Sequence, residues 1–155
     1  MKVTGAHHTS YTVSNLERSL EFYVGLLGCE VIWQRENRNQ YFRDIVGYPD
    51  SVAKMAMLSI PGSTHAIELI EYVVPRGVSA DVRTKNVGSS HIAFLVDDLR
   101  AAYEELSAAG VKFRSPPVAI TAGANKGAWA VYMTDPDGIT MEFFQPPKIK
   151  TGRET

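Results

Sequence analysis

Two histidines and two glutamates recur at matching places in this sequence of 155 residues. His8 and His91 each open a short β-rich segment, HTSYTV and HIAFLV. Glu68 and Glu142 each lie in a later apolar segment, IELIEY and MEFFQP. Imidazole nitrogens and carboxylate oxygens together suit a divalent cation of the Zn, Fe, Mn, Co or Ni type. The order His, Glu, His, Glu therefore indicates a candidate metal site.

Each of these residues taken singly also has a plainer explanation. A lone glutamate in an apolar strand can lie at a solvated sheet edge, and a lone histidine is more often a hydrogen-bonded structural residue. An ionised carboxylate is costly to bury unless it is paired or binds a metal. The recurrence of all four in register favours the metal site over four separate structural roles.

The segments that carry these residues belong to two copies of one unit. When the chain is aligned on its two histidine segments, Asn15 falls on Asp98 and, after one gap, Gly28 falls on Gly110. A unit of this size with one helix on one sheet buries little area alone, so both copies are expected in one domain. The division is a first module of about 5–73, a linker of 74–88, a second module of about 89–146 and a loose tail of 147–155.

Each copy has the local pattern of a β-α-β-β-β unit. Asn15 and Asp98 are suited to begin helices, because their side-chain oxygens can accept from free helical N–H groups. Gly28 and Gly110 come where a helix ends in the left-handed region, which glycine tolerates best. The predicted strands are 8–13, 30–35, 54–60 and 66–73 in the first copy, and 91–96, 112–114, 128–134 and 139–145 in the second.

The first copy is the longer of the two, and its excess falls within 37–51. This stretch, NRNQYFRDIVGYPDS, could form a lid or rim over a substrate or a plain surface helix, and the sequence leaves both open.

Composition excludes several classes of protein. The 16 basic and 17 acidic residues give a formal net charge of −1, which argues against a nucleic-acid partner bound through a broad basic face. The chain has no apolar run of about 18 residues and no signal-like N-terminus, so we expect no membrane span and a cytoplasmic protein. A single cysteine, Cys29, cannot form an internal disulfide or a multi-thiolate metal site.

Several segments together resemble the vicinal oxygen chelate superfamily, which holds glyoxalase I, methylmalonyl-CoA epimerase, extradiol dioxygenases and antibiotic-resistance proteins. The resemblance implies an α+β, glyoxalase-like fold, in which two tandem βαβββ modules form an open, barrel-like mixed sheet around a metal cleft. It also implies a homodimer and a small-molecule substrate. The segments are HTSYTVSNLERSLEFYVGLLGCEV, IELIEY, GSSHIAFLVDDL and DPDGITMEFFQ, within about 5–146.

The resemblance implies that His8, Glu68, His91 and Glu142 bind one divalent metal ion, with open coordination positions for substrate oxygens or water. The sequence does not decide whether one chain completes this site or two chains share it. Glu68 and Glu142 are the candidate catalytic bases, each able to leave the metal and accept a proton. Their equivalence in the repeat prevents a ranking.

Four ligands favour an isomerase, epimerase or lyase that moves a proton next to a carbonyl bound by the metal. DIVGYPDSVAKMAML, HAIELIEYVVPRG and the segment from FRSPP to FFQPP look similar to epimerases of carba-sugar precursors. One alternative is an Fe(II) extradiol-type dioxygenase, which typically uses two histidines and one carboxylate. Others are a lactoylglutathione lyase (glyoxalase I) and a metal-free antibiotic-binding resistance protein, which we expect to lack some ligands.

Neighbouring residues receive structural interpretations. His7 should point away from the face of His8, and Glu71 should lie on the strand face opposite Glu68. Cys29 is expected to be buried rather than reactive. A glutathione-linked substrate would need a basic patch, and the arginines that could supply one are Arg35, Arg38 and Arg43.

Overall fold

The structure is a computed structural model that describes residues 2–148. The chain divides into two compact units, Met1–Ala80 and Asp81–Thr155. Residues 149–155 of the expected loose tail lie outside the described residues. Each unit is a mixed sheet with a main helix packed on one face, and unit 1 has a second, shorter helix. The predicted α+β class is therefore confirmed.

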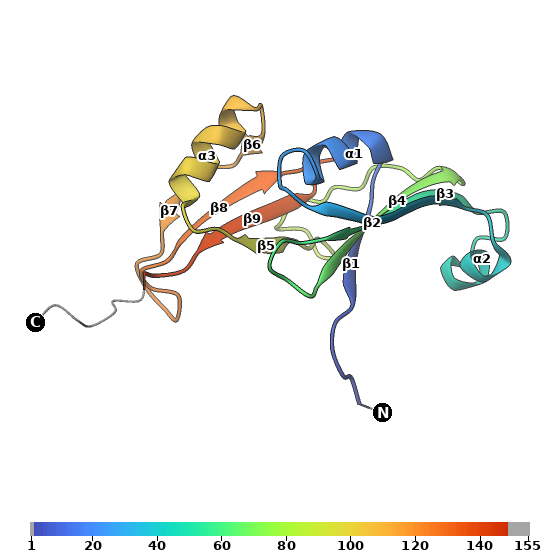
Figure 1. The fold of residues 1–155 in the computed structure, drawn as a ribbon, viewed down its shortest axis with the longest axis horizontal. Coiled ribbons are helices and arrows are strands. Elements are labelled where there is room, and N and C mark those ends of the chain that lie inside the picture. The colour runs from blue at the N-terminus through green and yellow to red at the C-terminus, as the bar shows by residue number, and fades with distance from the viewer. Residues whose placement is uncertain (1, 149–155) are drawn as a thin grey trace, which may run out of the picture. The chain divides into compact units, whose positions relative to one another are not determined.

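Unit 1 is a four-stranded sheet in the order β1-β4-β3-β2 (Figure 1). Strand β1 runs parallel to β4, and the other neighbours are antiparallel. Helix α1 packs on β3 and β4. The elements are β1 (His8–Thr12), α1 (Leu16–Tyr23), β2 (Glu30–Asn37), α2 (Gln40–Val46), β3 (Val52–Ser59) and β4 (Ala66–Val74).

Unit 2 repeats this topology. Its order is β5-β9-β8-β6, with β7 also paired to β8, and its first strand is again parallel to its last. The repeat predicted from the sequence is therefore present in the fold. The elements are β5 (Ile92–Leu95), α3 (Leu99–Ala108), β6 (Lys112–Phe113), β7 (Val118–Ala119), β8 (Trp129–Thr134) and β9 (Thr140–Gln145).

Both main helices begin with the predicted caps. The Asn15 side chain accepts from the Arg18 N–H at 2.9 Å, and the Asp98 side chain accepts from the Ala101 N–H at 3.0 Å. Gly28 and Gly110 have φ values of 73° and 88°, in the left-handed region where a side chain would add strain. Helix α1 nevertheless ends at Tyr23, and turn residues 24–27 lead to Gly28.

A second acceptor at each helix start comes from the last strand of the same unit. Glu71 Oε2 accepts from the Leu16 N–H at 2.9 Å, and Gln145 Oε1 accepts from the Leu99 N–H at 2.9 Å. Glu71 and Gln145 lie three residues beyond Glu68 and Glu142, so this contact is also part of the repeat. It ties each helix to the strand that carries a candidate ligand.

The core of unit 1 lies between α1 and the sheet. Its fully buried side chains come from the inner face of the helix and from the sheet face below it: Leu16, Tyr23, Leu58, Ile67 and Leu69. Over the described residues the longest helix has 10 residues, and none is long and apolar enough to cross a membrane.

Strand β7 and the stretch 37–51 show what the sequence prediction missed and what it left open. Strand β7 was not predicted, because it consists of only Val118 and Ala119 and two residues give no periodic pattern. The stretch 37–51 contains helix α2. A helix fits both interpretations of this stretch, so a role as a lid or rim is still a prediction.

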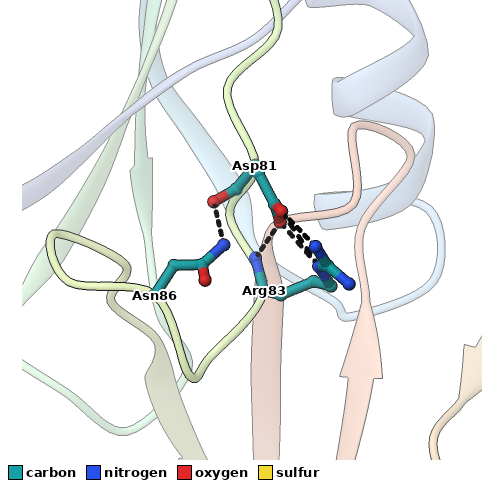
Figure 2. A network of polar contacts seen from close by, with 3 residues as sticks. All are labelled: Asp81, Arg83 and Asn86. Carbon is teal, nitrogen blue, oxygen red and sulfur yellow. Dashed lines mark hydrogen bonds and ion pairs between the residues drawn. The ribbon is translucent and has the colours of Figure 1, made fainter.

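Part of the predicted linker is ordered by its own side chains (Figure 2). Asp81 accepts from the backbone N–H of Arg83 at 3.2 Å and from its Nε at 2.9 Å. The amide of Asn86 donates to the Asp81 carbonyl at 3.0 Å. These hydrogen bonds, chiefly those from the Arg83 side chain, hold the pKa of Asp81 well below its usual range. The contacts are exposed, so they order the turn locally without building a core.

Candidate metal centre

His8 and Glu68 lie side by side on neighbouring strands of unit 1. Strand β1 pairs with β4 so that Ser10 is opposite Glu68, and His8 is two residues before Ser10. Because strand side chains alternate faces with a period of two, His8 and Glu68 point to the same side of the sheet. Nε2 of His8 is 3.5 Å from Oε2 of Glu68.

Unit 2 builds the same pair in the same register. Ala93 is opposite Glu142, and His91 is two residues before Ala93. Nε2 of His91 is 3.2 Å from Oε2 of Glu142. One backbone arrangement therefore makes both His–Glu contacts, and the matching positions in the sequence are matching positions in the two sheets.

The two pairs also share a pattern of exposure. The side chains of His8 and His91 are 35% and 37% exposed, whereas those of Glu68 and Glu142 are only 13% and 16% exposed. Among residues 2–148, no lysine or arginine nitrogen lies within 4.0 Å of either carboxylate. Each pair thus presents one accessible nitrogen and one shielded oxygen, which is a donor set that fits a divalent cation.

Each unit brings two of the four expected ligands together. Over residues 2–148, neither unit has a third His, Cys, Asp or Glu side chain close enough to its pair to form a three-residue metal site. The single metal ion shared by all four residues is therefore still a prediction.

His7 is not directed away from His8, and that expectation is wrong. The two Nδ1 atoms lie 2.7 Å apart, and the rings meet edge to face with centroids 5.0 Å apart. Strand β1 begins at His8, so the strand alternation that was applied to His7 does not reach it. With Nδ1 of His8 engaged by His7, Nε2 is the nitrogen available to a ligand.

Glu71 lies on the opposite face of β4, as predicted. It is buried with 8% of its surface exposed, it accepts from Leu16, and Nζ of Lys54 is 4.0 Å away. These contacts give Glu71 a structural role at the start of α1. Glu68 is therefore the carboxylate of β4 that faces the histidine.

Each pair stands beside a large side chain of the next strand. In unit 2, Tyr132 is directly opposite Glu142, and its ring centroid is 5.1 Å from that of His91. In unit 1, Met57 is opposite Glu68, and Trp33 is opposite Met57. The donor atoms thus adjoin apolar and aromatic surface, which suits a small organic ligand.

The inserted helix α2 covers part of the sheet face that carries Glu68. We call this surface the Glu68 face. Phe42 is 5% exposed and packs with Ala53 and Met55 on this face. The pKa of Tyr72 is raised by burial, by Tyr48 and by the charge of Glu68. By strand pairing and the alternation of side chains along each strand, the Glu68 face includes His8, Glu68, Ile70, Tyr72, Ala53, Met55, Met57, Trp33, Arg35 and Asn37.

Cys29 is not a nucleophile of this site. Its side chain is buried, with 2% of the residue exposed, and burial raises the pKa of its thiol to about 11. A thiol in this environment stays protonated near neutral pH, which agrees with the packing role expected from the sequence.

Comparisons with known proteins agree with this geometry. The sequence profile of the Glyoxalase/Bleomycin resistance protein/Dioxygenase superfamily matches residues 5–143. A 2-epi-5-epi-valiolone epimerase of Actinomyces sp. is 32% identical over 91% of this chain and 79% of its own length. A lactoylglutathione lyase of Haemophilus influenzae is 31% identical over 94% of this chain and 95% of its own length.

The fold is also found among solved structures. The crystal structure of a glyoxalase family protein from Bacillus cereus superposes with a TM-score of 0.78 and 18% identity, covering 95% of this chain and 97% of that one. The expected glyoxalase-like fold is therefore confirmed.

Proposed function

Because the chain belongs to the Glyoxalase/Bleomycin resistance protein/Dioxygenase superfamily, we propose that it is a divalent-metal-dependent isomerase, epimerase or lyase. The reaction moves a proton at the carbon next to a carbonyl of a small oxygenated substrate. The ligands are His8, Glu68, His91 and Glu142. The observation that carries this proposal is the His–Glu contact that both units build in one register, at 3.5 and 3.2 Å.

A divalent cation at these residues supplies Lewis-acid stabilisation of negative charge on a carbonyl oxygen. The protein supplies the base. Glu68 and Glu142 are largely shielded from water, and each forms an ion pair with a histidine. A carboxylate in that environment can accept the α-proton and return it to another carbon or to the opposite face.

The number of ligands favours proton transfer over oxygen activation. Non-haem Fe(II) oxygenases typically use two histidines and one carboxylate, which leaves three coordination positions open. Two histidines and two carboxylates leave fewer open positions. Retention of all four also argues against a metal-free antibiotic-binding protein.

Two reactions within this class have specific support. Epimerisation of a hydroxylated ketone is supported by the similarity to the Actinomyces epimerase. A lactoylglutathione lyase reaction is the second candidate, supported by the similarity to the Haemophilus lyase over nearly its whole length. Both begin with removal of a proton next to a carbonyl, so one carboxylate chemistry serves either.

The test is metal-dependent uptake of deuterium from heavy water. Purified protein is loaded in turn with Zn, Fe, Mn, Co or Ni. It is then incubated with cyclic hydroxylated ketones and with the hemithioacetal of methylglyoxal and glutathione, and NMR and mass spectrometry follow exchange at the α-carbon. We expect metal-dependent exchange with one substrate class, and its loss in Glu68→Gln or Glu142→Gln.

Glu71→Gln is the matched control, because it removes a carboxylate from the same strand on the opposite face and retains an oxygen for Leu16. Metal content is measured on every variant by plasma emission. If His8→Ala and Glu142→Ala bind as much metal as the unchanged protein, the ligand assignment is wrong. Exchange that persists unchanged in both glutamine variants would overturn the proposed role of the glutamates.

A further inference from the structure

Arg35 lies on the Glu68 face but does not neutralise Glu68. Arg35 is opposite Met55, and Met55 is opposite Ile70, two residues beyond Glu68 on β4. Two strand spacings and a two-residue step separate the backbones of Arg35 and Glu68 by about 12 Å. The guanidinium stacks over the ring of Trp33, 4.6 Å from its centroid.

Arg35 differs from the other two arginines considered from the sequence. Arg38 is paired with Glu36, and Nε of Arg43 donates to the carbonyl of Ser51. Within the described part of the chain, no carboxylate oxygen lies within 4.0 Å of the Arg35 guanidinium. Among the described residues, the Arg35 side chain makes one hydrogen bond, from Nη2 to the hydroxyl oxygen of Tyr41, at 3.2 Å. Most donors of this exposed guanidinium are therefore free for a ligand.

The Tyr41 hydroxyl is oriented by a buried amide. Asn37 is 1% exposed, and its Oδ1 accepts from the backbone N–H of Asn39 at 3.1 Å. A backbone N–H can only donate, so the Oδ1 and Nδ2 atoms of Asn37 cannot be exchanged. Nδ2 of Asn37 must then be the atom that donates to the Tyr41 oxygen, at 3.1 Å.

The Tyr41 oxygen therefore accepts two hydrogen bonds, one from Arg35 and one from Asn37. Two accepted hydrogen bonds use both lone pairs of the phenol oxygen, so its O–H is the only group left to bind a further partner. Tyr41 is 49% exposed, so a ligand can reach this hydroxyl. The result is a guanidinium and a hydroxyl that both present donors and no acceptor.

We propose that Arg35 and Tyr41 form a subsite on the Glu68 face that binds an oxyanion of the substrate, phosphate or carboxylate, several bonds from its reacting carbonyl. The inference rests on the proposed function, because it assumes that the carbonyl is held beside Glu68. Guanidinium groups favour planar, bidentate contacts with carboxylate and phosphate. The substrate class is then a short, hydroxylated carbonyl compound with an anionic end, such as a sugar phosphate or a keto sugar acid.

The first experiment tests the subsite without metal or turnover. Metal-free full-length protein is titrated separately with inorganic phosphate and with acetate, and NMR follows the indole N–H of Trp33 and the Nε–H of Arg35. We expect a saturable shift with at least one anion. Binding should weaken about tenfold or more in Arg35→Ala, and by a smaller factor in Arg35→Lys and Tyr41→Phe.

Arg38→Ala is the matched control, because it also removes one positive charge, but from a guanidinium that is already in an ion pair with Glu36. It should titrate like the unchanged protein, and the Trp33 signal in every variant reports whether the fold is intact. The subsite is overturned if neither anion gives a saturable shift, or if Arg35→Ala binds both as well as the unchanged protein.

The second experiment links the subsite to substrate choice and separates the two anions. Calorimetry on metal-loaded protein compares ribulose 5-phosphate with ribulose, and 5-ketogluconate with sorbose. We expect one anionic member to bind about tenfold or more tightly than its neutral partner, and the preference to vanish in Arg35→Ala. Equal binding within both pairs would overturn the assignment to a substrate oxyanion.

Metal content distinguishes the two proposals, because Arg35→Ala should bind metal normally. If Arg35→Ala loses the preference for the anionic ligand but still binds metal, the result supports the subsite and leaves the metal site unaffected. Absence of metal in the unchanged protein contradicts the proposed function and leaves the metal-free titration as the test of the subsite.

Discussion

The candidate ligands differ in solvent exposure. The His8 side chain is 35% exposed and that of Glu68 is 13% exposed; the corresponding values are 37% for His91 and 16% for Glu142. A base that must accept a proton benefits from exclusion of water, because electrostatic interactions strengthen as water is removed. The histidines, which need only a lone pair, can remain accessible.

Cys29 provides a prediction at the scale of one residue. Its thiol has a pKa of about 11, so only about one molecule in a thousand carries a thiolate at pH 8. Native protein should react with a thiol reagent such as DTNB orders of magnitude more slowly than protein unfolded in guanidinium chloride. Rapid stoichiometric labelling at pH 8 in the native state would contradict the buried thiol.

The residues that could be predicted from the sequence were those repeated in both copies. His8, Glu68, His91 and Glu142 stood out because each has a counterpart in register. Tyr41 and Asn37 could not be found in this way, because they lie in the insertion 37–51, which has no counterpart in the second copy. Their roles depend on which atom of the Asn37 amide faces the Tyr41 hydroxyl, and that is fixed only in the folded structure.

At the scale of elements, each main helix is tied to the last strand of its own unit. The first helical N–H donates to the carboxylate of Glu71 in unit 1 and to the side-chain amide oxygen of Gln145 in unit 2. The natural use of an amide in unit 2 shows that charge is not required for this contact. The essential feature is an oxygen acceptor at the buried start of the helix.

Replacing Glu71 tests this contact. Glu71→Ala leaves the buried N–H of Leu16 unsatisfied, and it should lower the free energy of unfolding by about 1–3 kcal/mol. Glu71→Gln should cost less, because Gln145 fills the equivalent place. Urea denaturation measures both variants, and equal losses would show that charge rather than the acceptor oxygen matters.

Helix α2 gives a second prediction at this scale. Phe42 anchors the helix to the Glu68 face, whereas Ile45 on the same helix is 77% exposed. Phe42→Ala should speed amide exchange in α2 about a hundredfold, in line with the loss of a buried phenylalanine. Ile45→Ala serves as the control and should leave exchange unchanged. Slow exchange in both variants would mean that other contacts hold α2.

Element prediction from the sequence succeeded for the capped helix starts and for the apolar strands. Asn15 and Asp98 marked both helix starts, and nearly continuous apolar segments marked β4 and β9. The end of α1 was placed too late, because Leu26 and Leu27 continue the apolar spacing through turn residues 24–27. Strand β7 was missed because a two-residue strand depends on pairing with β8 rather than on its own sequence.

At the scale of the whole molecule, the duplication makes a stoichiometric prediction. If all four residues bind one ion, metal-saturated protein should contain one metal ion per chain. His8→Ala and His91→Ala should each lose most of it, because a missing histidine weakens the whole site. Two ions per chain, with one kept in each single variant, would mean that each His–Glu pair binds its own metal.

Mixing the two histidine variants extends this measurement. If pairs from two chains share a site, some mixed dimers carry one site with both histidines, and metal binding partly returns. If each chain builds its own site, mixing restores nothing. The comparison decides how the duplicated halves are used in solution.

Strands β4 and β9 carry one further consequence, which concerns tolerance to change in length. In each, a candidate ligand and a helix-capping residue lie three positions apart on opposite faces. A one-residue insertion or deletion between them would turn one of the two away from its partner, because strand side chains alternate. We therefore expect Glu68–Glu71 and Glu142–Gln145 to accept substitutions at their intervening residues but no change in spacing. A library of single-codon insertions and deletions, selected for folded protein that binds metal, should be empty in these two short windows.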